Sequence, residues 1–224
     1  MAISGDVLTA INSGELELLR ELIARDASAA SVRDENGVSA LLNALYRGRQ
    51  DMVEVLLSAG ESLDIFESAA LGNSARISEL LDSDPPLARA FSSDGFTPLH
   101  LACFFRQEGS ARILLHAGAD PAVEARNKMK VQPLHSAVAA RQRAIAEMLL
   151  RAGAPVDAQQ QGGWTALHAA AQHSDRETVE LLLEFGADPN VENQEGKTAL
   201  DLGTQDPEVV RMLCSASARR QAAG

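Results

Sequence analysis

The chain has 224 residues, of which 46% are hydrophobic, 23% are charged and only 4% are aromatic. Its 20 basic and 31 acidic side chains give a formal net charge of −11, which argues against nucleic acid as the main partner because phosphates must be met by a basic surface. A core of Ala, Leu and Val with few rings favours closely packed helices over a β-sandwich.

The first predicted elements are two capping helices in residues 4–25, which open an N-terminal unit of residues 4–33. A second unit, residues 34–60, carries Val38-Ser39-Ala40-Leu41 where later units carry a more regular phrase. The third unit, residues 61–93, lacks that phrase, and Pro85-Pro86 interrupts its link to the next unit. We therefore expect the third unit to be shortened.

A four-residue phrase recurs in the rest of the chain at spacings of 35, 33 and 33 residues. Its copies are Thr97-Pro98-Leu99-His100, Gln132-Pro133-Leu134-His135, Thr165-Ala166-Leu167-His168 and Thr198-Ala199-Leu200-Asp201. A second phrase, Gly-Ala, follows the first three copies at Gly118, Gly153 and Gly186. These phrases place further units at residues 94–126, 127–160, 161–193 and 194–224.

Each copy of the first phrase is suited to start a helix. Thr97 can cap the helix, and Pro98 lies in the first turn, where its missing N–H costs nothing. Gly118 can end the second helix of the unit by adopting a left-handed conformation. Such a pair of helices cannot bury its apolar face alone, so neighbouring units must stack.

These phrases, repeated in phase over nearly the whole chain, resemble the ankyrin repeat. The resemblance implies an all-α fold: an ankyrin-type helical-repeat solenoid with short β-turn or hairpin fingers. A single domain would then span residues 1–224 in about seven units, counting both caps.

Three histidines, His100, His135 and His168, occupy the fourth place of the phrase. In ankyrin-like units this histidine bonds to neighbouring backbone and couples repeats. Histidines one unit apart stand about 10 Å from each other, too far to share a zinc ion whose ligand bonds are about 2 Å. Because no motif of a nucleophile elbow, phosphate loop or zinc helix is present either, we expect no metal, no cofactor and no enzymatic activity.

The resemblance also indicates where a partner would bind. In the family, the concave surface is lined by the turn tips before the phrase and by the ends of the first helices, and most of the aromatic residues of this chain fall at such places. Phe185, just before Gly186, is expected near the same rim. The candidate partner-binding residues are Tyr46, Phe96, Phe104, Phe105, Arg106, Lys128, Met129, Lys130, Val131, Arg141, Trp164, Gln172, His173 and Phe185. The alternative for Phe104 or Phe105 is that one of them turns inward to pack between repeats.

Charge is unevenly distributed along the chain. Residues 1–105 carry a net charge of −9, residues 106–151 a net charge of +4 and residues 152–224 a net charge of −6. Arg126, Lys128 and Lys130 cluster in the turn before Val131, which the 35-residue spacing makes about two residues longer than its neighbours. This basic band favours a partner with an acidic segment; a solvated loop without a binding role is the alternative.

The glycine that closes the first helix in this family is kept as Gly48 and Gly72 but is replaced by Arg106, Arg141 and Ser174. A residue with a side chain forced to positive φ costs roughly 1 kcal/mol. We interpret the three replacements as a surface altered for contact at some expense in stability. Selection for a partner and engineering would both produce this pattern.

The function expected from these observations is a scaffold that binds another protein through its concave face and finger tips. A self-associating structural protein, which forms a homodimer through the same surface, and a regulatory module for a separate enzyme are the alternatives. Only two cysteines occur, Cys103 and Cys214, and no stretch approaches the roughly 20 apolar residues of a membrane span. We therefore expect a cytoplasmic protein that does not bind membranes or nucleic acid.

Overall fold

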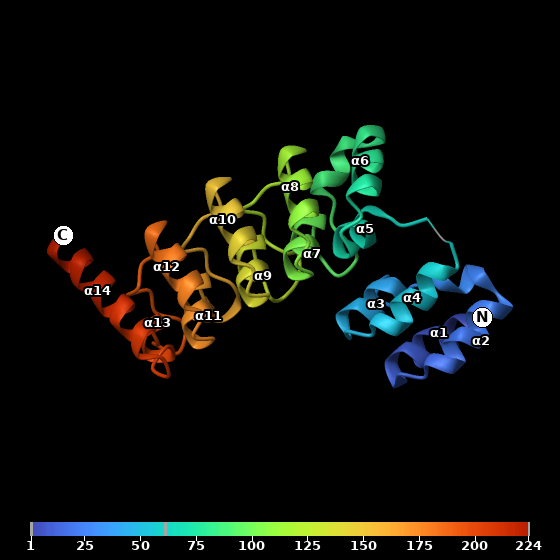
Figure 1. The fold of residues 1–224 in the computed structure, drawn as a ribbon, viewed down its shortest axis with the longest axis horizontal. Helices are drawn as coiled ribbons and strands as arrows, with labels where there is room; N and C mark the ends of the chain where they lie inside the picture. The colour runs from blue at the N-terminus through green and yellow to red at the C-terminus, as the bar shows by residue number, and fades with distance from the viewer. Residues whose placement is uncertain (1, 61, 224) are drawn as a thin grey trace.

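The computed structural model describes residues 2–60 and 62–223, which form a one-dimensional stack of helix pairs (Figure 1). Extended pairing in this part of the chain is limited to one antiparallel bridge between Arg33 and Ser39. The all-α repeat architecture expected from the phrases is therefore confirmed.

The helices form two rows. The inner row contains α1 (Ala2–Ser13), α3 (Ala40–Tyr46), α5 (Ile65–Leu71), α7 (Pro98–Phe104), α9 (Pro133–Ala139), α11 (Ala166–Gln172) and α13 (Ala199–Leu202). The outer row contains α2 (Leu16–Arg25), α4 (Gln50–Ser58), α6 (Ser74–Ser83), α8 (Glu108–His116), α10 (Arg143–Arg151), α12 (Arg176–Glu184) and α14 (Pro207–Ala223). Short 3₁₀ helices follow α2, α6 and α10: η1 (Ala27–Ser31), η2 (Pro85–Arg89) and η3 (Gln161–Gly163).

The inner helices begin as the phrase predicts. The Nδ1 atom of His100 accepts a hydrogen bond from the Thr97 backbone N–H at 3.2 Å, so the two residues form a reciprocal capping box. His168 caps Thr165 in the same way. In the third unit, which lacks the phrase, Asp64 and Glu67 make an equivalent box from two carboxylates. Burial raises the pKa of Glu67, and the neighbouring Asp64 carboxylate adds to this shift.

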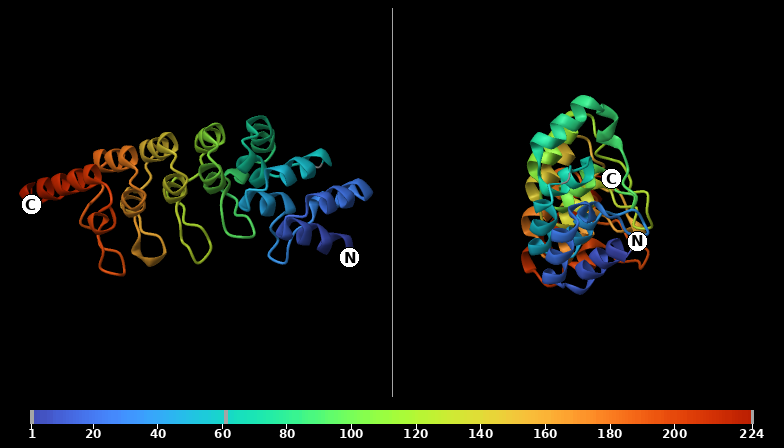
Figure 2. Two further views of the ribbon diagram at one scale, coloured as in Figure 1. Left: turned by 60° about the horizontal axis from the view of Figure 1, so that its bottom comes forward. Right: turned by 90° about the vertical axis from the view of Figure 1, so that its right-hand side faces the viewer.

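Successive units are joined by polar contacts as well as by packing. The Nε2–H groups of His100, His135 and His168 each donate at 3.0 Å to a backbone carbonyl in the loop that leads into the next inner helix, the acceptors being Val131, Ala158 and Lys197. The loops that lead into the inner helices, here called fingers, all hang from the same side of the stack in the left view of Figure 2. The structural role expected for the three histidines therefore matches their observed contacts.

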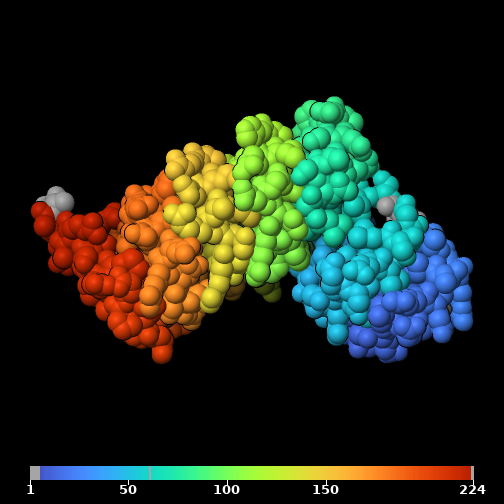
Figure 3. Space-filling model, viewed as in Figure 1, coloured from blue at the N-terminus to red at the C-terminus, as the bar shows by residue number. Residues whose placement is uncertain are grey.

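The hydrophobic core is divided at the start of the shortened third unit, between α4 and α5. One cluster of buried residues is built by α1 to α4, and a larger one runs from Ile65 of α5 to Leu213 of α14. A small cluster of Val38, Leu42, Ala70 and Leu101 connects the two. In the space-filling view, the N-terminal helices are offset from the rest of the stack (Figure 3). The joint between α4 and α5 is therefore the least continuous part of the core.

Candidate protein-binding groove

Five of the predicted binding residues line one groove between the inner helices and the fingers. Tyr46, Phe96, Phe104, Met129 and Val131 contribute to its wall, and its volume is about 890 Å³. The groove extends over four units, and its other lining residues are Asp94, Leu101, His135, Ser136, Ala139, Gln160, Gln161 and Gly162. Sites that bury much of a small ligand have volumes of about 300–1,000 Å³, so this groove is large enough to receive a side chain of a partner.

Large apolar side chains are unusually exposed in this groove. Tyr46 and Phe104 end the inner helices α3 and α7 and are 38% and 47% exposed, while Met129 at a finger tip is 47% exposed. Exposed apolar surface that gathers in one place on a soluble protein often marks an interaction site. Leu57, on the outer helix α4, is the other large hydrophobic residue with comparable exposure among the described residues.

The aromatic rings at the N-terminal end of the groove contact one another. The ring centroid of Tyr46 is 6.5 Å from that of Phe104 and 5.6 Å from that of Phe105, and the last two rings meet edge to face at 5.1 Å. Phe105 is half-buried and packs against the small connecting cluster. The inward-turning alternative therefore applies to Phe105, while Phe104 stays exposed to the groove.

Tyr46 closes this end of the groove by reaching across the shortened unit. Its hydroxyl donates a hydrogen bond of 2.8 Å to Asp94, whose other carboxylate oxygen accepts one of 2.5 Å from Ser92. Burial and the Asp94 carboxylate both raise the pKa of Tyr46, so the phenol stays protonated and keeps donating. Because the third unit has no finger, the fingers on either side of it approach each other, and a Cβ atom added at Gly37 would lie 3.0 Å from the Cβ of Ser93.

The finger of residues 124–131 holds Met129 over the opposite part of the groove. Asn127 fixes this finger: its amide donates to the Asp94 carbonyl at 3.0 Å, and its side-chain oxygen accepts from the Met129 N–H at 3.0 Å. The Met129 carbonyl in turn accepts from the N–H of Gln161 at 2.9 Å. Lys128 and Lys130 on either side of Met129 are exposed. The third basic residue of the cluster, Arg126, packs its guanidinium 3.8 Å from the centre of the Phe91 ring, which holds it back from the tip.

Several predicted residues lie outside the groove. Trp164 is half-buried, and its ring centroid is 5.9 Å from that of His168. Gln172 and His173 are exposed at the end of α11, one inner helix beyond α9, whose Ala139 lines the groove. Arg141 donates a 3.3 Å hydrogen bond to the His173 carbonyl, which ties its side chain to that unit.

The expected position of Phe185 near the groove rim does not match the structure. This residue caps the outer helix α12 and packs, half-buried, against the larger core cluster. The reason is that the residue before Gly186 ends an outer helix, whereas the groove is lined by inner helices and fingers.

The left-handed backbone expected at the ends of three inner helices is present. The φ angles of Arg106, Arg141 and Ser174 are 64°, 55° and 52°. Lys130 also has a positive φ of 49°. It stands two residues before its copy of the phrase, where the neighbouring units carry Gly95, Gly163 and Gly196 with positive φ, a recurrence that the sequence analysis missed.

The lining residue that the sequence analysis missed is above all Asp94. Asp94 lies in the turn Ser92-Ser93-Asp94-Gly95, and an Asp before a Gly is typical of a turn, so the local sequence gave no sign of a bond to Tyr46. Gln160, Gln161 and Gly162 were missed for a similar reason, because they enter the groove from the next finger.

The buried histidines and the buried cysteine have pKa values shifted by their surroundings. Burial lowers the pKa of His100 to about 4 and also lowers that of His135, so both rings are neutral near pH 7. Burial raises the pKa of the Cys103 thiol. In residues 2–60 and 62–223, no three His, Cys, Asp or Glu side chains are grouped so that they could hold a metal ion. Nor does any helix in this part of the chain have the length and apolar character needed to cross a membrane.

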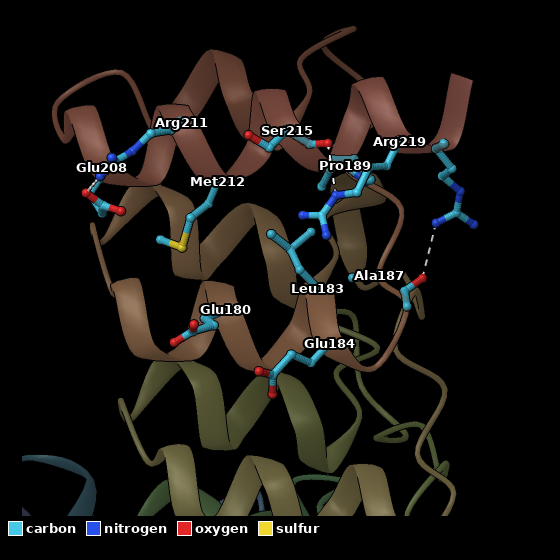
Figure 4. A pocket seen from close by; sticks show the side chains of 13 residues that line it. Glu180, Leu183, Glu184, Ala187, Pro189, Glu208, Arg211, Met212, Ser215 and Arg219 are labelled. Atoms are coloured by element: carbon cyan, nitrogen blue, oxygen red, sulfur yellow. Dashed lines mark hydrogen bonds and ion pairs between the residues drawn. The ribbon is translucent and has the colours of Figure 1, made fainter. Parts of the chain in front are cut away.

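A second cavity, of about 750 Å³, lies between the outer helices α12 and α14 (Figure 4). Glu180 and Glu184 project from α12, and Arg211 and Arg219 from α14, with Leu183 and Met212 between them (Figure 4). Arg211 forms an ion pair with Glu208 on its own helix. Because acidic and basic groups are mixed around this cavity, its charge favours no particular ligand.

Comparison with protein-family models gives three matches. Residues 134–222 match a model described as ankyrin repeats (3 copies), residues 94–128 match a single ankyrin repeat, and residues 7–57 match ankyrin repeats (many copies). The longest stretch outside these three matches is residues 58–93, which contains the shortened unit. A comparison with curated proteins found no match.

Proposed function

Because the chain belongs to the ankyrin repeat family, whose members generally mediate protein–protein interactions, we propose that it is a non-catalytic scaffold that holds a partner protein in the groove. The observation that carries this proposal is the meeting of exposed Tyr46, Phe104 and Met129 in one concave site. Aromatic side chains in a concave, desolvated site are typical of the few residues that supply most of the binding energy at an interface.

The charge around the groove supports a partner with an acidic segment. The finger that carries Lys128 and Lys130 belongs to the part of the chain with a net charge of +4, between two acidic parts. Exposed cations of this kind steer an acidic partner and set its orientation more than they add to affinity. Arg106, exposed at the end of α7, adds a further cation close to Phe104.

The scaffold proposed here acts in a reducing compartment such as the cytoplasm. Both cysteines are free thiols, Cys103 buried and Cys214 exposed. Disulfides are rare in such compartments, and an exposed free thiol is compatible with them.

Affinity capture from the source cell tests the proposal. Bait with Phe104→Ala and Met129→Ala should lose the captured partner, whereas bait with Leu57→Ala, an equally exposed apolar residue on the outer row, should keep it. Equal capture by both baits would show that the groove is not the binding surface.

Self-association through the same groove is the competing function. It predicts a dimer by light scattering at tens of micromolar that the Phe104→Ala and Met129→Ala substitutions dissociate. A monomer at that concentration leaves the groove open for another protein.

A further inference from the structure

The finger side of the groove is held together by hydrogen bonds between successive fingers. The Arg126 N–H donates to the Gly95 carbonyl at 2.8 Å, and the Gln161 N–H donates to the Met129 carbonyl at 2.9 Å. The hydrogen bond of the Tyr46 hydroxyl ties the first of these fingers to the end of α3. The groove is therefore formed before a partner arrives, which favours selection by fit over adaptation to many side chains.

The titratable side chains of the lining already have partners within the protein. The two carboxylate oxygens of Asp94 accept hydrogen bonds from Tyr46 and Ser92. The two ring nitrogens of His135 are 3.1 Å and 3.0 Å from backbone atoms with which they bond. The described lining residues include no lysine or arginine. A partner side chain that is buried here is therefore best uncharged, because the lining offers no free group to balance a charge.

Ser136 is a polar lining residue without such a partner. It lies in α9 and is only 7% exposed, and its hydroxyl makes no hydrogen bond with the other described residues. The same place in the flanking units, directly after the histidine, is occupied by Leu101 and Ala169. A buried hydroxyl is unfavourable unless it is hydrogen-bonded, so Ser136 requires a polar group that enters through the groove.

The surface around this hydroxyl suits an aromatic ring. Tyr46, Phe96 and Phe104 contribute rings to the lining, and Met129 contributes a thioether, which packs well against aromatic rings. A phenol combines a ring of this kind with one uncharged hydrogen-bonding group at its tip. Because a phenol and a serine hydroxyl can both donate and accept, the two can pair in either direction.

We infer that the groove receives a tyrosine side chain of the partner and that Ser136 determines this specificity by hydrogen bonding to the tyrosine hydroxyl. The inference rests on the proposed function, because it names the side chain that the same groove holds. A phenylalanine in this place would exclude water from Ser136 and leave its hydroxyl unpaired. The groove should therefore select tyrosine over phenylalanine, as sites built to bond a hydroxyl do.

Capped amino acids test this inference without knowledge of the natural partner. The probes are the N-acetyl amides of tyrosine, phenylalanine and 4-methylphenylalanine, the last of which has the size of tyrosine but no hydroxyl. Binding to the full chain would be followed by the NMR shift of the Met129 methyl group, which lines the groove and can be assigned with Met129→Leu. The tyrosine amide should bind at least threefold more tightly than either of the others.

Two serine substitutions identify the group responsible. Ser136→Ala removes the hydroxyl, so the three probes should then bind within about twofold of one another. Ser68→Ala is the matched control: Ser68 follows the capping box of α5 as Ser136 follows that of α9, and its buried hydroxyl also lacks a partner, but it does not line the groove. This control should keep the preference for tyrosine.

The inference would be overturned if the tyrosine amide bound no more tightly than the other two, if its preference persisted in Ser136→Ala, or if Ser68→Ala abolished it equally. It also fails if no probe shifts the Met129 methyl group at millimolar concentrations. In each of these cases the scaffold function stands as long as capture of the cellular partner depends on Phe104 and Met129. If capture also fails to depend on those two residues, the groove itself is the wrong site.

Discussion

Restoring glycine at the ends of the inner helices should stabilise the protein. The cleanest position is Arg106, which has a φ of 64° and whose side chain makes no hydrogen bond or ion pair with the other described residues. Left-handed backbone costs a residue with a side chain about 1–2 kcal/mol, and the greater freedom of glycine in the unfolded chain removes about 0.4–1 kcal/mol of the gain. Arg106→Gly should therefore raise the free energy of unfolding by about 0.5–1 kcal/mol.

The size of the effect depends on what each side chain does in the folded state. Ser174, with a φ of 52°, should gain a similar amount as glycine, whereas Arg141→Gly should gain less because it loses the hydrogen bond to the His173 carbonyl. The reciprocal change, Gly48→Arg, isolates the backbone contribution, since a Cβ atom at Gly48 meets no atom within 4 Å and its φ is 66°.

Urea denaturation at pH 7, followed by circular dichroism, measures these changes. In thermal denaturation, Arg106→Gly should raise Tm by about 2 °C, since a chain of this size moves about 2–4 °C per kcal/mol. Gly48→Arg should lower the stability by a similar amount. If Arg106→Gly is neutral or destabilising while Gly48→Arg is tolerated, the strain assigned to these positions is not real.

Four further results are expected. The free energy of unfolding should fall between pH 7 and pH 5, because the pKa of His100 is about 6.5 in the unfolded chain but about 4 in the folded protein. This residue alone accounts for a loss of about 2 kcal/mol at pH 5. A smaller loss in His100→Gln would confirm its part. Hydrogen exchange should be faster in α5 and α6 than in α11 and α12, because the core is divided in front of α5; equal protection would contradict that division. Once the partner is identified, Phe96→Ala should cost about 2 kcal/mol or more in binding free energy, while Glu180→Ala on the outer row should change it by less than about 0.5 kcal/mol. Calorimetry that reversed this order would falsify the groove assignment. Lys128→Ala should mainly slow association and weaken its salt dependence, so an unchanged association rate at low salt would remove Lys128 from the interaction.

The sequence predicted those features that depend on contacts within one unit or with its direct neighbour. Thr97 and His100 form a capping box three residues apart, and the same histidine reaches the next unit at a distance set by the repeat. The positive φ of Arg106 followed from its place in the repeat, where Gly48 and Gly72 stand in other units. All of these recur with the period of the chain, so comparison of the units revealed them.

The features that could not be predicted arise where the period is broken. The missing finger of the third unit lets the fingers on either side approach, and this brings Asp94 to Tyr46 over a separation of 48 residues. The sequence left open whether Phe104 or Phe105 turns inward, and in the structure Phe105 packs on the cluster that joins the two parts of the core. Phe185 was misplaced for a simpler reason: its neighbour Gly186 ends an outer helix, and proximity to a recurring glycine does not tell which row a residue belongs to.

A stack of similar units has a near-translational symmetry, and an extended partner that fits between two fingers can often shift by one unit and fit again. The bridge between Tyr46 and Asp94 breaks this symmetry in the finger row, because it joins the second unit to the fourth. A segment anchored against this stop has a single binding register. The missing finger of the third unit thus distinguishes one position along an otherwise repeating surface from all the others.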